Sequence, residues 1–119
     1  MRYSRSALLL SALIGATAPA VGQETCTPVL STKSSGHSDV VNFQRRWTAV
    51  FTVDASRCFT TNGGFEIEFL RFKDVGPDLT FTEWFIWVIG ETEVRLDLSW
   101  DEWVSAHRIA KVRSCPCRP

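Results

Sequence analysis

The most apolar and most regular window of the chain runs from Phe81 to Trp103, and the rest of the fold has to pack around it. Its first half, Trp84–Ile89, is a continuous apolar run of six residues, a length that favours a strand buried on both faces over a helix. In Val94–Ser99, apolar and polar residues alternate with a period of two, which gives a strand one buried and one wet face. Gly90-Glu91 suits a tight turn, because glycine tolerates a positive φ. The window therefore predicts a β-hairpin within a sheet.

The N-terminus has the pattern of a secretory signal peptide. It combines a positively charged start, an apolar core at 7–16 and the small residues of a cleavage site at 18–20. The apolar core is shorter than the roughly 20 residues that cross a bilayer, and no later stretch qualifies. We therefore expect residues 1–20 to be a signal peptide and 21–119 to form a single exported domain without a membrane span. Such a domain is periplasmic or secreted, and so plain a signal is typical of a bacterium.

The charge of the exported chain excludes some partners. Removing residues 1–20 takes away Arg2 and Arg5 and leaves 11 basic against 13 acidic side chains, a net charge of −2. Nucleic acids and anionic membranes both require a basic surface, so neither is expected as a partner. Between Asp54 and Glu102, 11 acidic side chains stand against 4 basic ones, and the chain then ends on basic residues. Either a basic final strand pairs beside an acidic one, or the acidic region faces a cationic partner.

Four cysteines follow the predicted signal peptide, and export would place them in an oxidising compartment where two disulfides form. Only Pro116 separates Cys115 from Cys117, so a bridge between these two would be strained. Cys26 and Cys58 should each pair with one of the two C-terminal cysteines, in an order that the sequence leaves open. A domain of 99 residues has a marginal core, and each bridge stabilises it by about 2–4 kcal/mol.

Cys115 and Cys117 also support an alternative function, a periplasmic protein that handles thiols and disulfides or a soft metal such as copper. Closely spaced thiolates bind copper(I) and exchange disulfides. A metal site normally recruits further ligands, however, and the exported chain has no methionine and only His37 and His107 to offer. The structural role is therefore favoured, and no metal or other cofactor is expected.

The segments before residue 74 predict a loop followed by two strands. Residues 24–39 are rich in Thr, Ser, Pro and Gly and are predicted to be irregular. Alternation predicts a first strand over Phe43–Asp54, and Asn62-Gly63-Gly64 is a strong turn signal before a second strand over Phe65–Lys73. In this second strand both faces carry apolar residues. Either a bulge at Phe69-Leu70 shifts the phase, or the second half of the strand is covered on the opposite face.

After the alternating stretch the period changes. Ser99 and Glu102 have the spacing of a capping box, which predicts a short helix from Trp100 to about His107, followed by a strand over 108–114. The fold class predicted from these elements is all-β. We expect a small antiparallel β-sandwich, jelly-roll or Ig-like, with one short helix near the C-terminus and two disulfides.

The aromatic content points to a binding site. Of the 99 exported residues, 13 are Trp or Phe, and most of these must be core. Trp100 and Trp103 lie three apart on the predicted helix, beside Asp101 and Glu102. These four residues are the candidate binding site, because the rings can stack on a sugar or an apolar partner while the carboxylates accept hydrogen bonds. The alternative is that the two tryptophans close the open end of the sandwich.

No set of residues supports catalysis. Glu66 and Glu68 lie on the wet face of a predicted strand, and Asp101 and Glu102 are neighbours that a helix points in different directions. The sequence has no nucleophile elbow, phosphate-binding glycine loop or histidine-rich metal motif. We therefore expect a non-enzymatic domain without catalytic residues. Its predicted function is to bind an envelope or extracellular protein, or a glycan, through an aromatic and acidic surface.

Overall fold

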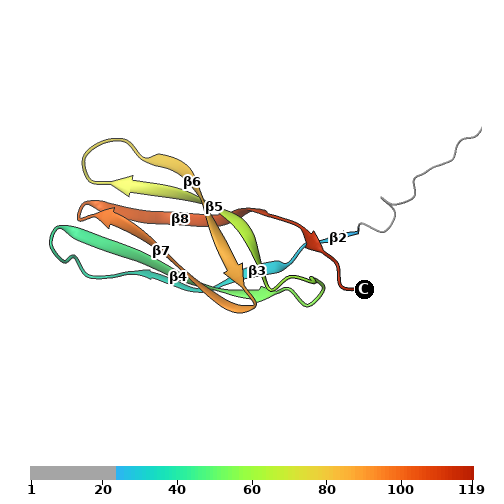
Figure 1. Ribbon diagram of the computed structural model, residues 1–119. Coiled ribbons are helices and arrows are strands. Elements are labelled where there is room, and N and C mark those ends of the chain that lie inside the picture. The colour runs from blue at the N-terminus through green and yellow to red at the C-terminus, as the bar shows by residue number, and fades with distance from the viewer. Residues whose placement is uncertain (1–23) are drawn as a thin grey trace, which may run out of the picture.

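The computed structural model describes residues 24–119, and all regular structure in this range is β (Figure 1). The strands are β2 (Thr25–Cys26), β3 (Val29–His37), β4 (Gln44–Asp54), β5 (Asn62–Lys73), β6 (Leu79–Val88), β7 (Gly90–Ser99), β8 (Glu102–Val112) and β9 (Cys115–Pro116). They form two three-stranded antiparallel sheets, with the orders β3-β4-β7 and β6-β5-β8, and a small β2-β9 pair. The prediction of an all-β, antiparallel fold is confirmed. The predicted signal peptide lies outside the described residues.

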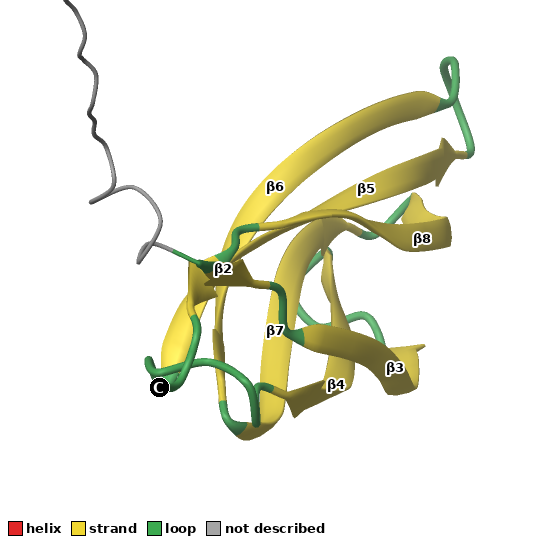
Figure 2. Cartoon of the chain, turned by 90° about the vertical axis from the view of Figure 1, so that its right-hand side faces the viewer, coloured by secondary structure: helices red, strands yellow, loops and turns green. Residues whose placement is uncertain are grey.

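The two sheets form separate layers (Figure 2) that pack through the apolar faces of their central strands. Trp47 of β4 lies edge-on to Phe69 of β5, with 5.1 Å between ring centroids, and Phe51 and Phe65 are 5.5 Å apart. All four rings are almost completely buried, which stabilises the fold by about 1.5–3 kcal/mol for each side chain. The alternation predicted for these two strands is therefore confirmed.

The hairpin predicted within Phe81–Trp103 is wrong, because its two arms belong to different sheets. Strand β6 pairs with β5, whereas β7 pairs with β4. The chain changes layers at Gly90, whose φ of 94° allows the sharp turn. The apolar run Trp84–Ile89 is not buried on both faces either: Trp87 is buried, but Ile86 is 63% exposed.

The segment predicted to be irregular, residues 24–39, contains β2 and β3. Its small polar side chains bury little surface, but its backbone pairs with β4 from Val29↔Asp54 to His37↔Trp47. A polar edge strand of this kind is stabilised by ladder hydrogen bonds and not by its own side chains. Hydrophobic periodicity therefore could not reveal it.

The short helix predicted from Trp100 to about His107 does not form, and these residues belong to a turn and to β8. Half of the predicted capping box is present, since the Ser99 N–H donates a hydrogen bond to Glu102 Oε1 at 2.7 Å. This bond closes the turn between β7 and β8 instead of starting a helix. The extended conformation is preferred because it pairs β8 with β5 along most of its length and buries Val104.

The predicted turn at Asn62-Gly63-Gly64 is also wrong, because these residues begin β5. Gly63 is needed for close packing: a Cβ atom there would lie 3.0 Å from the Trp87 ring. Register shifts in the β5–β8 pairing occur near the expected place, between Leu70 and Arg71, and also between Glu66 and Ile67. The second half of β5 nevertheless keeps its phase and leaves Leu70 exposed on the face opposite the core.

Two disulfides tie the C-terminal end of the described chain to its N-terminal part and to its middle. Cys26 bonds to Cys117 and Cys58 to Cys115, which confirms the predicted pattern and decides the pairing order. The bonds lie beside the β2-β9 pair, at the end of the molecule that holds the C-terminus (Figure 1). The β3–β4, β5–β6 and β7–β8 connections lie at the opposite end. The described residues include no helix long and apolar enough to cross a membrane.

Candidate functional site

The predicted binding residues Trp100, Asp101, Glu102 and Trp103 lie at the turn between β7 and β8, but they do not form one surface. Trp100 is 51% exposed. The Trp103 ring packs against Phe72, with 5.6 Å between ring centroids, and the Arg45 guanidinium lies 4.5 Å from its centroid. Asp101 is buried, and its backbone carbonyl accepts a hydrogen bond from the Asp74 N–H in the β5–β6 connection at 3.0 Å.

Glu102 is engaged within the protein. Its Oε1 accepts the hydrogen bond from the Ser99 N–H, and its Oε2 lies 3.0 Å from Arg71 Nη1 in an ion pair that is largely buried. The hydrogen bond from Ser99 lowers the pKa of Glu102 against the opposing effect of burial, and the charge of Arg71 adds to the lowering. Glu102 is therefore a structural carboxylate, and only Trp100 of the four predicted residues faces solvent as a large side chain.

Trp100 belongs to a group of exposed loop tips that we call the loop end: Val41, Phe43, Val75 and Trp100. The Trp100 N–H donates a hydrogen bond to the Phe43 carbonyl at 3.0 Å, which ties the β7–β8 turn to the β3–β4 hairpin. Asn42 and Phe43 form the two-residue turn of this hairpin, and both have a positive φ. The Phe43 ring is 80% exposed, so the hairpin displays it in solvent.

A larger apolar surface lies on the solvent side of the β6-β5-β8 sheet. Strands β5 and β6 turn their buried residues toward the other layer, and alternation places the next residues on the outside. We call this surface the apolar face, and its members are Leu70 (37% exposed), Phe72 (44%), Trp84 (43%), Ile86 (63%) and Val88 (47%). The guanidinium of Arg113 lies over the Trp84 ring, 4.6 Å from its centroid.

The other sheet shows how unusual this face is. The solvent side of the β3-β4-β7 sheet carries mainly hydroxyl and charged side chains, namely Arg46, Thr48, Thr52, Glu93, Arg95 and Asp97. That is the normal pattern for an antiparallel sheet with one wet face. Large exposed apolar patches on soluble domains mark contact surfaces for another molecule. The apolar face is therefore the stronger candidate site.

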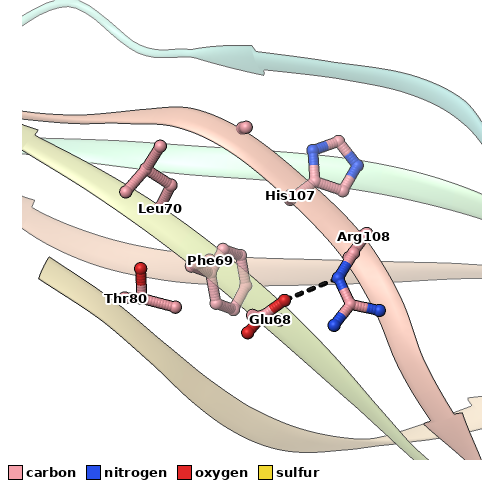
Figure 3. Close-up of a pocket in the computed structure, with 7 residues that line it drawn as sticks. Glu68, Phe69, Leu70, Thr80, His107 and Arg108 are labelled. Carbon is pink, nitrogen blue, oxygen red and sulfur yellow. Dashed lines mark hydrogen bonds and ion pairs between the residues drawn. The ribbon is translucent and has the colours of Figure 1, made fainter.

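A hollow of about 300 Å³ opens on the apolar face beside Leu70 (Figure 3). It exists because the neighbouring strands place small side chains, Thr80 and Ala106, on either side of Leu70. Glu68 and Arg108 form an ion pair at its rim. This hollow can accept an apolar side chain, with the ion pair as a polar border.

Both histidines form hydrogen bonds between β3 and β8. His37 Nε2 accepts a hydrogen bond from the Val104 N–H at 3.0 Å, and His107 Nε2 lies 3.2 Å from Thr32 Oγ1. Burial lowers the pKa of both imidazoles, and the charge of Arg45 lowers that of His37 further. The two rings join β3 to β8, and neither is hydrogen-bonded to a carboxylate of residues 24–119. Their role in this arrangement is structural.

The cysteines and acidic residues do not form a soft-metal site. All four cysteines are in disulfides, and within residues 24–119 no three side chains of the types His, Cys, Asp and Glu come together as ligands. Cys58 and Cys115 are both buried, so the Cys115 sulfur is neither a thiolate nor accessible. The geometry therefore favours the structural role of the cysteines.

Comparisons of the chain with protein-family models, with curated proteins and with solved structures found no match. The sequence did contain a signal for the apolar face. Leu70 and Phe72 have the opposite parity to the buried residues of β5, and the apolar run Trp84–Ile89 supplies both faces of β6.

Proposed function

We propose that this chain is an exported, non-enzymatic binding domain, a small β-sandwich of the jelly-roll or Ig-like kind, that recognises another extracellular or envelope protein through the apolar face. The observation that carries the proposal is the exposure of five large apolar side chains on the solvent side of one sheet, while the other sheet is polar there. Covering apolar surface of this extent with a partner removes it from water and lowers the free energy of the complex. The two disulfides support a location in an oxidising compartment.

A protein partner fits this face better than a glycan. Sugar sites combine aromatic platforms with several available polar groups, but of the two carboxylates on the outer side of β5 Glu68 is already paired with Arg108, which leaves Glu66 opposite Trp84. The centres of protein interfaces are instead apolar and aromatic, with arginine at prominent positions. Trp84 with its stacked Arg113 matches that composition. Basic residues on β8 border the face, so a partner with an acidic rim is expected.

A photo-crosslinking amino acid tests the proposal in the full chain, expressed and exported by its own cell. Placed at Leu70, the probe should yield one discrete cross-linked protein, because Leu70 lines the hollow on the apolar face. The matched control is Val50, an apolar residue on the solvent side of the other sheet, where no such product is expected. The same product at both positions, or none at Leu70, would refute the proposal.

A third probe position separates the apolar face from the loop end. Trp100 is the one residue of the sequence-predicted site that remains a large exposed side chain. A cross-link at Trp100 without one at Leu70 would move the recognition surface to the loop end. A glycan partner would show instead as binding of an oligosaccharide array that is lost on Trp100→Ala.

A further inference from the structure

The fold exposes four sheet edges. Each three-stranded sheet ends in two edge strands, which are β3 and β7 in one sheet and β6 and β8 in the other. An edge strand presents backbone N–H and C=O groups that can pair with another chain. Proteins protect such edges from pairing with charges, prolines or bulges, so an edge without these features indicates a site at which another strand can pair.

Three of the four edges carry these protections. The pairing of β3 shifts register between Thr32 and Ser34, at Lys33. The pairing of β8 shifts register twice, and the strand carries Arg108 and Lys111. Strand β7 carries four charged side chains in ten residues, at Glu91, Glu93, Arg95 and Asp97. Each of these strands is a poor template for a further strand.

Strand β6 has almost none of this protection. It pairs with β5 without a register shift from Leu79↔Arg71 to Val88↔Asn62. Its ten residues include no proline, lysine or arginine, and Glu83 is its one charged side chain. It is therefore the longest regular apolar edge that the described residues present.

The direction of the outward backbone groups can be read from one hydrogen-bonded residue. The Val88 N–H donates to Thr92 Oγ1 at 2.7 Å, and the same hydroxyl donates to the Val88 carbonyl at 3.1 Å. Thr92 lies on β7, so the backbone of Val88 points away from β5. Because these groups alternate along a strand, Thr82, Trp84 and Ile86 also direct theirs outward. Thr92 thus satisfies the outward backbone groups of Val88, and those of Thr82, Trp84 and Ile86 remain available for pairing with another strand.

We propose that β6 is a dimer interface at which it pairs with β6 of a second copy of this chain, joining two sheets into one continuous six-stranded sheet. A two-fold axis makes such self-pairing antiparallel, the arrangement that two identical strands form in a symmetric dimer. The interface is made by backbone hydrogen bonds and flanked by the apolar side chains of both copies. This inference goes beyond the proposed function, because the edge of the sheet, not its face, makes the contact.

The charge pattern of β6 is compatible with a second copy as the occupant, because self-pairing brings no like charges into contact. On the solvent side β6 carries no charge, and the nearest charged residues, Glu66 and Glu68, lie one strand away on β5. In the dimer, the β5 strands of the two copies are three strand spacings apart, about 14 Å, which exceeds the Debye length of about 8 Å. Self-pairing of β7 would instead bring together strands rich in Glu and Asp. A register centred on Trp84 sets Glu83 opposite Phe85 of the second copy. The two Glu83 carboxylates, one from each copy, therefore do not lie directly opposite each other.

The test is the oligomeric state of the exported chain, measured by sedimentation velocity and light scattering from low to high micromolar concentration. We expect a concentration-dependent dimer. Thr82→Pro removes an N–H that points to the open edge while leaving the ladder to β5 intact, and edge strands tolerate proline there. It should weaken dimerisation by about tenfold or more, which corresponds to the loss of at least one hydrogen bond.

A second pair of variants covers the case in which Thr82→Pro does not fold. Ile86→Lys adds a charge at the edge, and Val29→Lys is its matched control on β3, because the two residues are 63% and 65% exposed. Ile86→Lys should abolish the dimer and Val29→Lys should leave it unchanged. A protein that stays monomeric throughout the range, or a dimer that survives Ile86→Lys, would overturn the proposal.

Leu70→Asp distinguishes pairing at the edge from packing of two faces. Leu70 lies on the central strand β5, so this variant alters the apolar face and leaves the β6 edge intact. The dimer should persist in Leu70→Asp. Loss of the dimer in Leu70→Asp would show face-to-face association and refute edge pairing, because Ile86 belongs to both surfaces and Leu70 only to the face. Failure of the cross-link at Leu70 would leave the dimer result unaffected, so the two proposals fail separately.

Discussion

Phe43 has a backbone conformation that its side chain disfavours. Its φ is 64°, and that of Asn42 before it is 53°. Asparagine tolerates this left-handed region, but a residue with a bulky side chain loses about 1–2 kcal/mol there. Two hydrogen bonds between Val41 and Gln44, of 2.8 and 3.0 Å, close the turn and hold the conformation. The exposed ring gains little burial to offset the strain, so the conformation is held by the turn and not by packing of the side chain.

Replacing Phe43 should reveal this strain. Phe43→Gly relieves it, although glycine adds conformational entropy to the unfolded chain, so we expect the glycine variant to be about 0.5–1 kcal/mol more stable than Phe43→Ala. At Val41, whose φ is not positive, glycine should be less stable than alanine. Urea denaturation of the four variants measures both differences. The same order at the two positions would contradict the interpretation.

Replacing two strand glycines, Gly63 and Gly36, by alanine should change the free energy of unfolding differently. At Gly63 a new Cβ atom would meet the buried Trp87 ring at 3.0 Å, so Gly63→Ala should lower the free energy of unfolding by about 1–3 kcal/mol. Gly36 has no atom within 4 Å of the same position, and Gly36→Ala should be neutral or slightly stabilising. Thermal melts compare the two variants. Equal losses would show that strand propensity, not packing against Trp87, decides.

At the scale of elements, β3 and β8 form a seam between the two sheets. The strands belong to different layers, and the two histidines join them through Val104 and Thr32. The charged side chain that acts on His37 is Arg45, whereas the rings of Trp47 and Phe51 surround His107, at 5.0 and 6.1 Å between centroids. His37 accepts a hydrogen bond through the nitrogen that acid would protonate, so the seam requires neutral imidazole.

Acid should therefore loosen the seam. The pKa of each histidine is lower in the folded than in the unfolded chain, where it is about 6.5. The unfolded chain binds more protons, so the stabilisation is fully present above about pH 6.5 and is lost as the pH falls through the folded-state pKa values. Urea denaturation between about pH 7.5 and pH 5 should show a falling free energy of unfolding, and a smaller fall for the double variant His37→Gln/His107→Gln.

The carboxylates with lowered pKa values titrate at a lower pH than the histidines, so they do not contribute to the pH dependence expected between about pH 7.5 and pH 5. Hydrogen bonding by Ser56 lowers the pKa of Asp54, and Ser99 lowers that of Glu102. Both groups start from ordinary values near 4, so their contribution is lost only below that pH. Identical pH dependence in the wild type and the double histidine variant would contradict the role assigned to the seam.

At the scale of the whole molecule, the two ends differ in how they are held. The disulfide end is covalently closed, with bridges that span 57 and 91 residues of sequence. The opposite end is closed by noncovalent contacts, among them the Trp100–Phe43 hydrogen bond and the ion pair of Arg71 with Glu102. The exposed side chains of the loop end are thus presented by a body that is covalently fixed at the other end.

Removing either bridge should cost about 2–4 kcal/mol of unfolding free energy. Loop length alone favours the longer Cys26–Cys117 bridge by only about 0.4 kcal/mol. Cys58 and Cys115 are both buried in the core, so Cys58→Ala/Cys115→Ala also leaves a cavity and should be the more destabilising pair. Chemical denaturation of the two double variants tests the order. A larger loss for Cys26→Ala/Cys117→Ala would show that loop closure outweighs burial here.

Local patterns in the sequence were sufficient for several features. Alternation over β4 and over Phe65–Phe69 predicts their buried faces, because the side-chain period of two is a property of the strand itself. The strain expected in a Cys115–Cys117 bridge follows from their separation by one residue, and it leaves two pairing orders, of which the structure shows Cys26–Cys117 with Cys58–Cys115. The all-β class follows from the number of such alternating segments.

Where a local sequence pattern was compatible with two conformations, only the tertiary structure decided between them. The Ser99–Glu102 hydrogen bond is compatible with a helix or a turn, and pairing of β8 with β5 selected the turn. The glycines before Phe65 suit a turn or a close contact, and the ring of Trp87 selected the contact. The alternation in the sequence showed that both sides of β5 and β6 are apolar, but not which side a second sheet would cover. Burial depends on the other layer, and that layer left Leu70, Trp84 and Ile86 in solvent.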